Sequence, residues 1–328
     1  MKEELAELVE ELKGRRILIL GDMIADIYLE GNIARISREA PVLVLEQAAE
    51  RVVAGGAANV VNNVATLGGC AFMAGVAGQD TASEGLRRIL LEREVDMSGL
   101  LIDKSRPTIS KTRIIAGGRA TVSQQIVRID RESKAPLSES LEKELLNAVL
   151  ELLPEVQGVV LSDYGSGTIT QKIGEEVIAY CRQKGIPTIV DSRYDIKRFH
   201  GIDYVKQNDS ELATAVGWEL DSEQALIEAG QALLAAMEAK GVLVTRGEKG
   251  MMLFEADGSI HDIPVSDKSE VFDVSGAGDT CVATVILALA AGARPEKAAE
   301  LSNIASGIAV RKMGTATVSS EELRKAVS

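Results

Sequence analysis

Residues 158–190 read GVVLSDYGSGTITQKIGEEVIAYCRQKGIPTIV. Short apolar runs at 158–161 and 188–190 flank a segment, 173–184, in which apolar residues recur at helical spacing. Consecutive strands joined through a helix pair in parallel, and strands as apolar as these are covered on both faces. This stretch predicts one unit of a doubly wound α/β core with a mostly parallel sheet.

The same alternation extends over most of the chain. Further apolar runs of strand length occur at 16–20, 71–76, 204–205 and 242–244, and residues 139–153 have helical spacing. In open α/β sheets ligands bind outside the carboxyl ends of the strands, so the polar residues that follow these runs are candidate site residues. They are Asp22, Asp26, Asp163, Asp191, Asn208, Glu211 and residues 245–247. Taken singly, each could instead be a turn or helix-cap residue.

Two segments break this alternation. Residues 33–46 and 109–130 have β-type alternation and no helix between their parts, which predicts a small β lid, inserted at about 27–46 and 107–131. No repeat or long linker interrupts the chain, so residues 1–328 are predicted to form a single domain. Apolar lid residues could pair the lid with that of a second copy in a homodimer. They include Val42, Val44, Ile114 and Val127.

The composition argues against several classes of protein. The 36 Lys and Arg residues against 49 Asp and Glu give a net charge of −13, which disfavours nucleic-acid and membrane partners. The Glu-rich start of the chain is unlike a signal peptide, and the longest apolar stretch, 281–293, is too short to cross a bilayer, so a cytoplasmic location is expected. Cys70, Cys181 and Cys281 lack metal-site or disulfide spacing and are expected to be reduced core thiols.

The strongest chemical signal is DVSGAGDT at residues 273–280, directly before an apolar helical stretch at 281–291. Gly276 and Gly278 allow backbone amides to approach an anion, and a helix N-terminus adds positive potential beside a transferred phosphoryl group. Asp279 among these amides suits a general base that takes the proton of an attacking hydroxyl. A glycine turn in which Asp279 only caps the helix is the alternative. The chain contains no GxxxxGK[ST] and no strand-GxGxxG-helix, which disfavours P-loop and ordinary Rossmann proteins.

Two further motifs offer ligand groups. Residues 208–211, NDSE, place an amide and a carboxylate three residues apart, where both could hold Mg²⁺ through water. The alternative is an N-cap with Glu in the first helical turn. Gly55 and Gly56 precede a helix that contains Asn59, so a sugar could lie against backbone and bond to the amide side chain. Tight packing of that helix on the sheet is the alternative.

In order and spacing, these motifs resemble those of the ribokinase-like PfkB carbohydrate kinases over nearly the whole chain. The resemblance implies a Rossmann-like α/β domain with a β lid, and in-line transfer of the γ-phosphoryl group of ATP to a sugar hydroxyl with Mg²⁺. It implies that Asp279 is the base and that the amides of Gly276, Ala277 and Gly278 form an anion hole. The other residues that it implicates are Asp26, Gly55, Gly56 and Asn59 for the sugar; Asn208, Asp209, Ser210 and Glu211 for Mg-ATP; and Thr245, Gly247, Asn303 and the turn at 314–315 for the nucleotide.

Within this family the chain is most similar to the heptose kinase domain of the bacterial ADP-heptose pathway. The residues that carry this similarity are 35–42, Gln124, Gln125, Arg128, Asp130, 162–164, Asn303 and 314–318. It implies phosphorylation at C1 of a heptose 7-phosphate. A kinase for another sugar, sugar phosphate or nucleoside, and a non-catalytic sugar or nucleotide sensor, are the alternatives. Basic lid residues are the candidate contacts of a substrate phosphate, with Arg35 and Arg38 first and Lys111, Arg113, Arg119 and Arg128 beside them.

Overall fold

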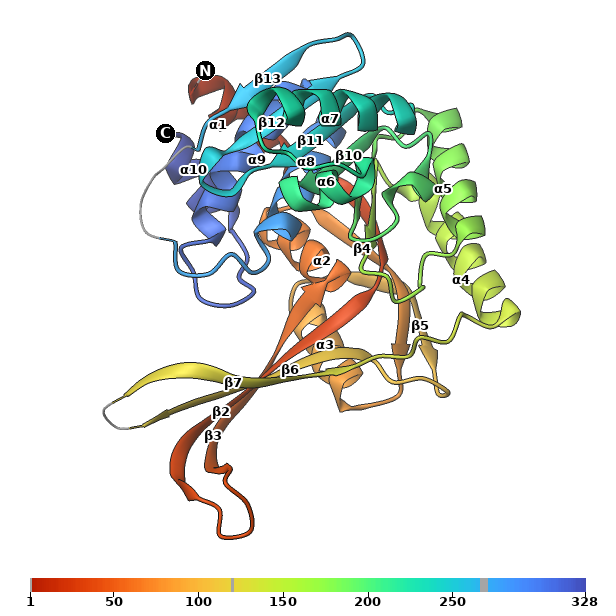
Figure 1. Ribbon diagram of the computed structural model, residues 1–328. Helices are drawn as coiled ribbons and strands as arrows, with labels where there is room; N and C mark the ends of the chain where they lie inside the picture. The colour runs from red at the N-terminus through yellow and green to blue at the C-terminus, as the bar shows by residue number, and fades with distance from the viewer. Residues whose placement is uncertain (1, 119–120, 266–270) are drawn as a thin grey trace.

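A nine-stranded sheet lies at the centre of the computed structural model, which describes residues 2–118, 121–265 and 271–328 (Figure 1). Neighbouring strands in it pair in parallel, except that the last two at one edge are antiparallel. In order across the sheet the strands are β13 (Ile260–Ile263), β12 (Met251–Glu255), β11 (Gly241–Thr245), β10 (Tyr204–Asn208), β9 (Thr188–Ser192), β8 (Gly158–Asp163), β1 (Arg16–Gly21), β4 (Cys70–Gly78) and β5 (Asp96–Asp103).

Helices cover both faces of this sheet because successive side chains of its strands point to opposite faces. In β1, Ile17 and Ile19 belong to one apolar cluster and Leu18 and Leu20 to the other. The first cluster includes α1 (Lys2–Glu11), α2 (Ala57–Thr66), α3 (Thr81–Leu91), α8 (Ala277–Ala290), α9 (Pro295–Ala309) and α10 (Ser320–Val327). The second includes α4 (Glu139–Leu152), α5 (Gln171–Lys184), α6 (Asp209–Val216) and α7 (Glu223–Met237), and short 3-10 turns are η1 (Leu153–Glu155), η2 (Ile196–Phe199) and η3 (Gly247–Lys249). The predicted doubly wound core is confirmed.

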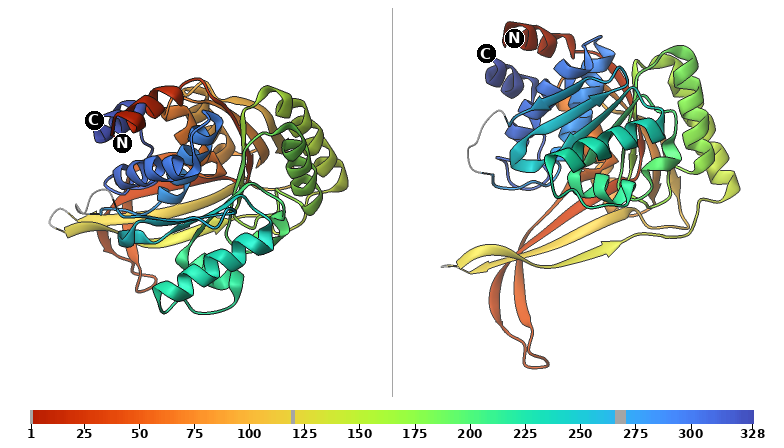
Figure 2. Two further views of the ribbon diagram at one scale, coloured as in Figure 1. Left: turned by 90° about the horizontal axis from the view of Figure 1, so that it is seen from above. Right: turned by 45° about the horizontal axis from the view of Figure 1, so that its top comes forward.

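A second sheet, four-stranded in the described residues, projects from one end of the core (Figure 2). Its strands, in order, are β3 (Leu43–Gly56), β2 (Met23–Ile36), β6 (Ile109–Gly118) and β7 (Thr121–Arg131). β2 with β3 and β6 with β7 form antiparallel hairpins, and β2 pairs in parallel with β6, which places Asp26 beside Lys111. The predicted small β sheet is confirmed. Its first hairpin is longer than expected, because β2 and β3 stay paired back to Met23 and Gly56.

Two details differ from the expectations. Cys70 is exposed at the first position of β4, so only Cys181 and Cys281 are core thiols. The helix expected from residue 281 begins at Ala277, because Gly276 adopts the left-handed conformation that ends the preceding turn. Asp279 therefore lies inside the first turn of α8. None of the helices in the described residues is both long and apolar enough to span a membrane.

Candidate active site

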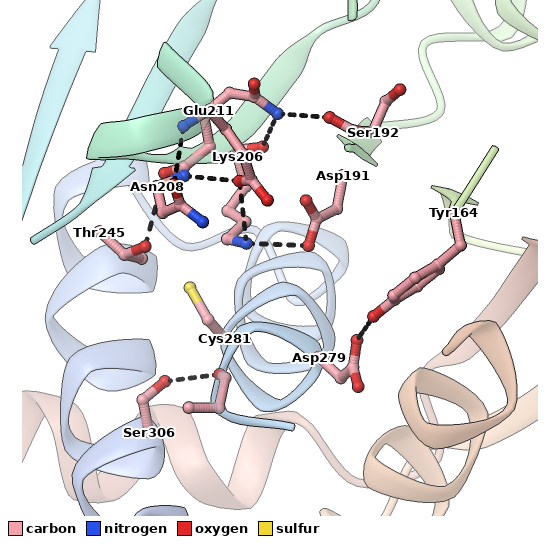
Figure 3. Close-up of polar contacts among 12 residues, drawn as sticks. Tyr164, Asp191, Ser192, Lys206, Asn208, Glu211, Thr245, Asp279, Cys281 and Ser306 are labelled. Atoms are coloured by element: carbon pink, nitrogen blue, oxygen red, sulfur yellow. Dashed lines mark hydrogen bonds and ion pairs between the residues drawn. The ribbon is translucent and has the colours of Figure 1, made fainter. Parts of the chain in front are cut away.

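The N-terminus of α8 faces the carboxyl ends of the central strands, and Figure 3 shows side chains from several strand ends gathered around it. Gly276 caps the helix with φ +81°, and a Cβ there would lie 2.8 Å from Asn59 Nδ2. The amides of Gly278 and Asp279 occupy the start of the helix, where no intrahelical acceptor exists. The amide of Ala277, predicted to join the anion hole, donates to Val274 O at 3.3 Å.

Asp279 is 5% exposed, and both of its carboxylate oxygens accept a hydrogen bond. Asn59 Nδ2 donates to Oδ2 at 2.7 Å. The hydroxyl of Tyr164 donates to Oδ1 at 2.8 Å (Figure 3). Burial raises the pKa of Asp279 to about 6, against the two hydrogen bonds, which act to lower it. Such a carboxylate is ionised at neutral pH and still basic enough to accept a proton.

Asn59 is held by a chain of buried hydrogen bonds between α2 and α8. Asn63 Nδ2 donates to the backbone carbonyl oxygen of Asn59 at 2.9 Å and to the side-chain oxygen Oδ1 of Asn59 at 3.3 Å. The hydroxyl of Thr280 donates to Asn63 Oδ1 at 2.9 Å. Because buried polar groups are costly to leave unpaired, this chain fixes the amide of Asn59 against Asp279. Asn59, predicted to bind sugar, thus contacts the predicted base.

A buried lysine lies beside the start of α8. Lys206 Nζ donates to Asp191 Oδ2 at 2.9 Å and lies 4.0 Å from Glu211 Oε2 (Figure 3). Burial acts to lower the pKa of Lys206, but the carboxylates of Asp191 and Glu211 outweigh it and raise that pKa, so the ammonium stays charged. A Cβ on Gly278 would lie 3.0 Å from Nζ, which places this cation against the predicted anion hole.

The motif at 208–211 forms the N-terminus of α6. Asn208 Oδ1 accepts from the amide of Glu211 at 2.8 Å, and Glu211 Oε2 accepts from the amide of Asn208 at 2.8 Å, which is a capping box. Asp209 and Ser210 are exposed in the same turn. Burial raises the pKa of Glu211, with Lys206 opposing. Among the described residues none hydrogen-bonds to Oε1 of Glu211, so this oxygen fits a hydrated Mg²⁺, which usually binds one or two carboxylates and keeps several waters.

Asp26 ties the second sheet to the core. Arg113 Nη1 donates to Asp26 Oδ1 at 2.6 Å, and the hydroxyl of Thr315 donates to Oδ2 at 3.0 Å. A Cβ on Gly55 would lie 2.6 Å from Asp26 Oδ2, and one on Gly56, whose φ is +53°, would lie 2.7 Å from Ile24 Cδ1. Close packing alone therefore requires both glycines, whatever they contribute to sugar binding.

The remaining predicted residues lie further from Asp279. Thr245 Oγ1 donates to Gln207 O at 3.5 Å, Gly247 opens η3, and Asn303 Nδ2 donates to Pro264 O at 2.7 Å, so the predicted nucleotide roles rest on position alone. Arg35 and Arg38 are exposed near the tip of the β2–β3 hairpin. Arg35 follows Asp26 by nine residues on β2, roughly 30 Å of strand, so the structure does not bring it to the site of its own chain. Arg119 lies outside the described residues.

Two residues of this site were not singled out by the sequence reasoning. Tyr164 was grouped with its neighbours as a family feature, and its bond to Asp279 joins residues 115 positions apart. Lys206 is not among the candidate residues of the sequence analysis. Its signal was present, since a lysine in the middle of a buried strand is rare unless it is paired.

The profile of the pfkB family of carbohydrate kinases matches residues 15–323. The chain belongs to this family. Membership confirms the carbohydrate kinase class predicted above, with ATP and Mg²⁺ as the cofactors that such kinases use. The oxygen atoms of Glu211 and the helix N-terminus of α8 suit these two ligands by their chemistry.

Known proteins similar to this pfkB kinase agree in sequence and fold. A protein named bifunctional protein HldE, from Paramagnetospirillum magneticum, is 40% identical over 321 residues, which is 97% of this chain and 64% of that protein. Escherichia coli phosphofructokinase-2 in complex with substrates and products has a TM-score of 0.76 at 23% identity, with 96% and 98% of the two chains covered. Arabidopsis thaliana ribokinase complexed with ribose and ATP has a TM-score of 0.72 at 19% identity, with 96% and 99% covered. The predicted ribokinase-like fold is confirmed.

Proposed function

We propose that this pfkB kinase transfers the γ-phosphoryl group of ATP to the anomeric hydroxyl of a heptose 7-phosphate. The observation that carries the kinase chemistry is the buried Asp279, with a pKa of about 6, in the first turn of α8. The choice of sugar is supported by the sequence resemblance to heptose kinase domains and by the 40% identity to a protein named HldE. The chain spans 64% of the length of that relative, so the comparison concerns only the matched part.

Asp279 is the proton acceptor in this proposal. As the anomeric oxygen attacks the phosphoryl group, its proton passes to a carboxylate oxygen of Asp279. Asn59 and Tyr164 orient that carboxylate through their 2.7 Å and 2.8 Å hydrogen bonds. A base fixed in this way needs no reorientation during the reaction.

In this proposal, positive charge at the N-terminus of α8 stabilises the transferring phosphoryl group. The amide of Gly278 and the buried ammonium of Lys206 lie together at the N-terminus of α8. When bound with ATP, Mg²⁺ neutralises charge on the phosphates. In this proposal Glu211 and Asn208, which pair at the start of α6, would hold that ion through water.

A panel of acceptors tests this proposal. ADP release is measured with ATP, Mg²⁺ and heptose 7-phosphate, fructose 1- and 6-phosphates, ribose or adenosine, with each unphosphorylated partner included. We expect the highest kcat/KM for heptose 7-phosphate. Preference for ribose, adenosine or a neutral sugar rejects the heptose phosphate and leaves the kinase class in place, whereas no ADP release with any acceptor favours a sensor.

A further inference from the structure

Two cations lie over the ring of Tyr164, the residue that bonds to the proposed base. Lys111 Nζ, from β6, is 5.3 Å from the ring centroid, and Arg193 Cζ, just after β9, is 5.1 Å from it. The hydroxyl of the same ring contacts Asp279 at 2.8 Å. Both cations therefore lie one aromatic ring away from the carboxylate that would receive the sugar proton.

These cations lack the acidic partners that their neighbours have. On the same face of the second sheet Asp26 pairs with Arg113 at 2.6 Å and Asp130 with Arg128 at 2.8 Å, while at the rim Asp191 pairs with Lys206 at 2.9 Å. Within the described part of the chain, neither Lys111 nor Arg193 has a carboxylate within 4.0 Å. In that part of the chain both cations are thus without an ion pair, in a protein of net charge −13.

The environment of Lys111 also favours the binding of an anion. Its side chain is half-buried, and burial lowers its pKa, with Arg193 and Arg128 lowering it further. Asp26 and Asp130 oppose this shift, but both already pair with arginines. A dianion between Lys111 and Arg193 would attract both cations and offset the repulsion between them.

We propose that Lys111 and Arg193 bind the terminal phosphate of the acceptor, and that they set the preference of this kinase for a phosphorylated sugar. The proposal rests on the proposed function. Two cations match the two charges of a phosphate monoester, and a sugar phosphate spans from them past Tyr164 to Asp279. Arg193 supplies a planar donor fork from the end of β9, and Lys111 supplies a compact charge from β6 of the second sheet.

Other cationic positions fit this role less well. Arg35 and Arg38 are exposed near the hairpin tip, far along β2 from the site. A cleft of about 400 Å³ beside Tyr164 is lined by Lys134, but Glu132 lines it too and lies 3.5 Å from that ammonium. Lys134 is thus paired with a carboxylate, whereas, among the described residues, Lys111 and Arg193 are not.

The test compares a phosphorylated acceptor with its unphosphorylated form. The variants Lys111→Gln and Arg193→Gln are each assayed for kcat/KM with heptose 7-phosphate and with the same heptose lacking phosphate. We expect each variant to lose at least about 10-fold on the phosphorylated sugar and to change little on the other, because a lost charge-assisted hydrogen bond affects only the phosphate. Lys111→Arg should keep most of the preference.

Controls separate phosphate binding from support of Tyr164 and Asp279. Lys134→Gln removes a nearby exposed lysine and should leave the ratio of the two kcat/KM values unchanged. An equal loss on both sugars assigns Lys111 to positioning of the tyrosine and overturns the proposal. If the wild type phosphorylates no sugar, the proposed function fails. The phosphate-binding proposal is then tested by calorimetry with heptose 7-phosphate. It requires that the wild type binds this sugar and that each Gln variant binds it at least about 10-fold more weakly.

Discussion

Asp279 combines burial with two hydrogen-bond donors, and their opposing effects set its proton affinity. Burial raises its pKa to about 6, while the bonds from Asn59 and Tyr164 act in the other direction. The charged form is the active base, so protonation on the acid side removes activity. The enzyme should therefore be active at pH values above the pKa of Asp279.

We expect kcat/KM to fall about 10-fold per pH unit below about pH 6 and to level off above it, because kcat/KM reports the pKa of the free enzyme. A pH–rate profile measures this. Tyr164→Phe removes a hydrogen bond that lowers the pKa of Asp279. The pH at which the profile of this variant levels off should therefore be higher than in the wild type. A sugar phosphate itself ionises near pH 6, so the profile is repeated with an unphosphorylated acceptor. A flat profile from pH 5 to pH 8 with that acceptor would contradict the assignment.

The first turn of α8 depends on the absence of a side chain at Gly278. A Cβ there would lie 3.0 Å from Lys206 Nζ and 3.8 Å from Asp191 Oδ2. We expect Gly278→Ala to lower kcat by about 10-fold or more, since the methyl group displaces the cation and crowds the amides. Steady-state kinetics with a melting curve measures this, and Gly174→Ala in α5, whose Cβ would meet Phe199 at an ordinary 3.6 Å, is the control. Unchanged kcat in folded Gly278→Ala would remove the anion hole from this turn.

The start of α6 uses one glutamate for both a cap and a proposed metal contact. Glu211→Gln keeps an oxygen for the capping bond but removes a negative charge, so we expect a several-fold rise in the Mg²⁺ concentration for half-maximal rate. A Mg²⁺ titration of the rate measures it. Glu322→Gln changes the same position of the capping box in α10, where no metal role is proposed, and should titrate like the wild type. If both variants overlay the wild type, Glu211 is a cap only.

At the level of elements, the sequence predicted what depends on local periodicity. The apolar runs at 158–161 and 188–190 became β8 and β9, since buried parallel strands need no polar alternation. The predicted start of α8 lies four residues after the observed one. Glycine disfavours the interior of a helix, so Gly278 weakened the helical pattern, but in the first turn of α8 a glycine is tolerated. The length of the β2–β3 hairpin was missed because its pairing extends through residues with mixed polarity.

The contacts that assemble the site were beyond local patterns. Tyr164 meets Asp279 only because β8 and the N-terminus of α8 reach the same rim. Lys206, in contrast, was detectable as a charged residue within a buried strand. In residues 208–211 the capping box is present, which confirms the alternative of an N-cap with Glu in the first turn. The Mg²⁺ contact of Glu211 stays a prediction.

The projecting sheet bears on the assembly of the whole molecule. Exposed apolar side chains occur on both of its hairpins: Ile36 and Val42 at the tip of the first, and Val127 and Ile129 on β7 of the second. Exposed apolar patches and open strand edges favour association, so we expect a homodimer formed through this sheet. In sedimentation, the double variant Val42→Lys, Ile129→Lys should shift toward monomer. Leu91→Lys changes an exposed apolar residue on α3, away from this sheet, and should behave like the wild type. A wild type that is monomeric at assay concentration would contradict this expectation.

The central claim for the whole molecule is that Asp279 is the base of a sugar kinase, and the turnover of Asp279→Asn tests it most directly. The variant keeps the size of the side chain and removes the proton acceptor, so kcat should fall at least about 100-fold while ATP affinity stays within a few-fold. ADP release on the preferred acceptor and calorimetric ATP binding give the two values. Turnover close to wild type in the folded variant would show that Asp279 serves only the structure of α8.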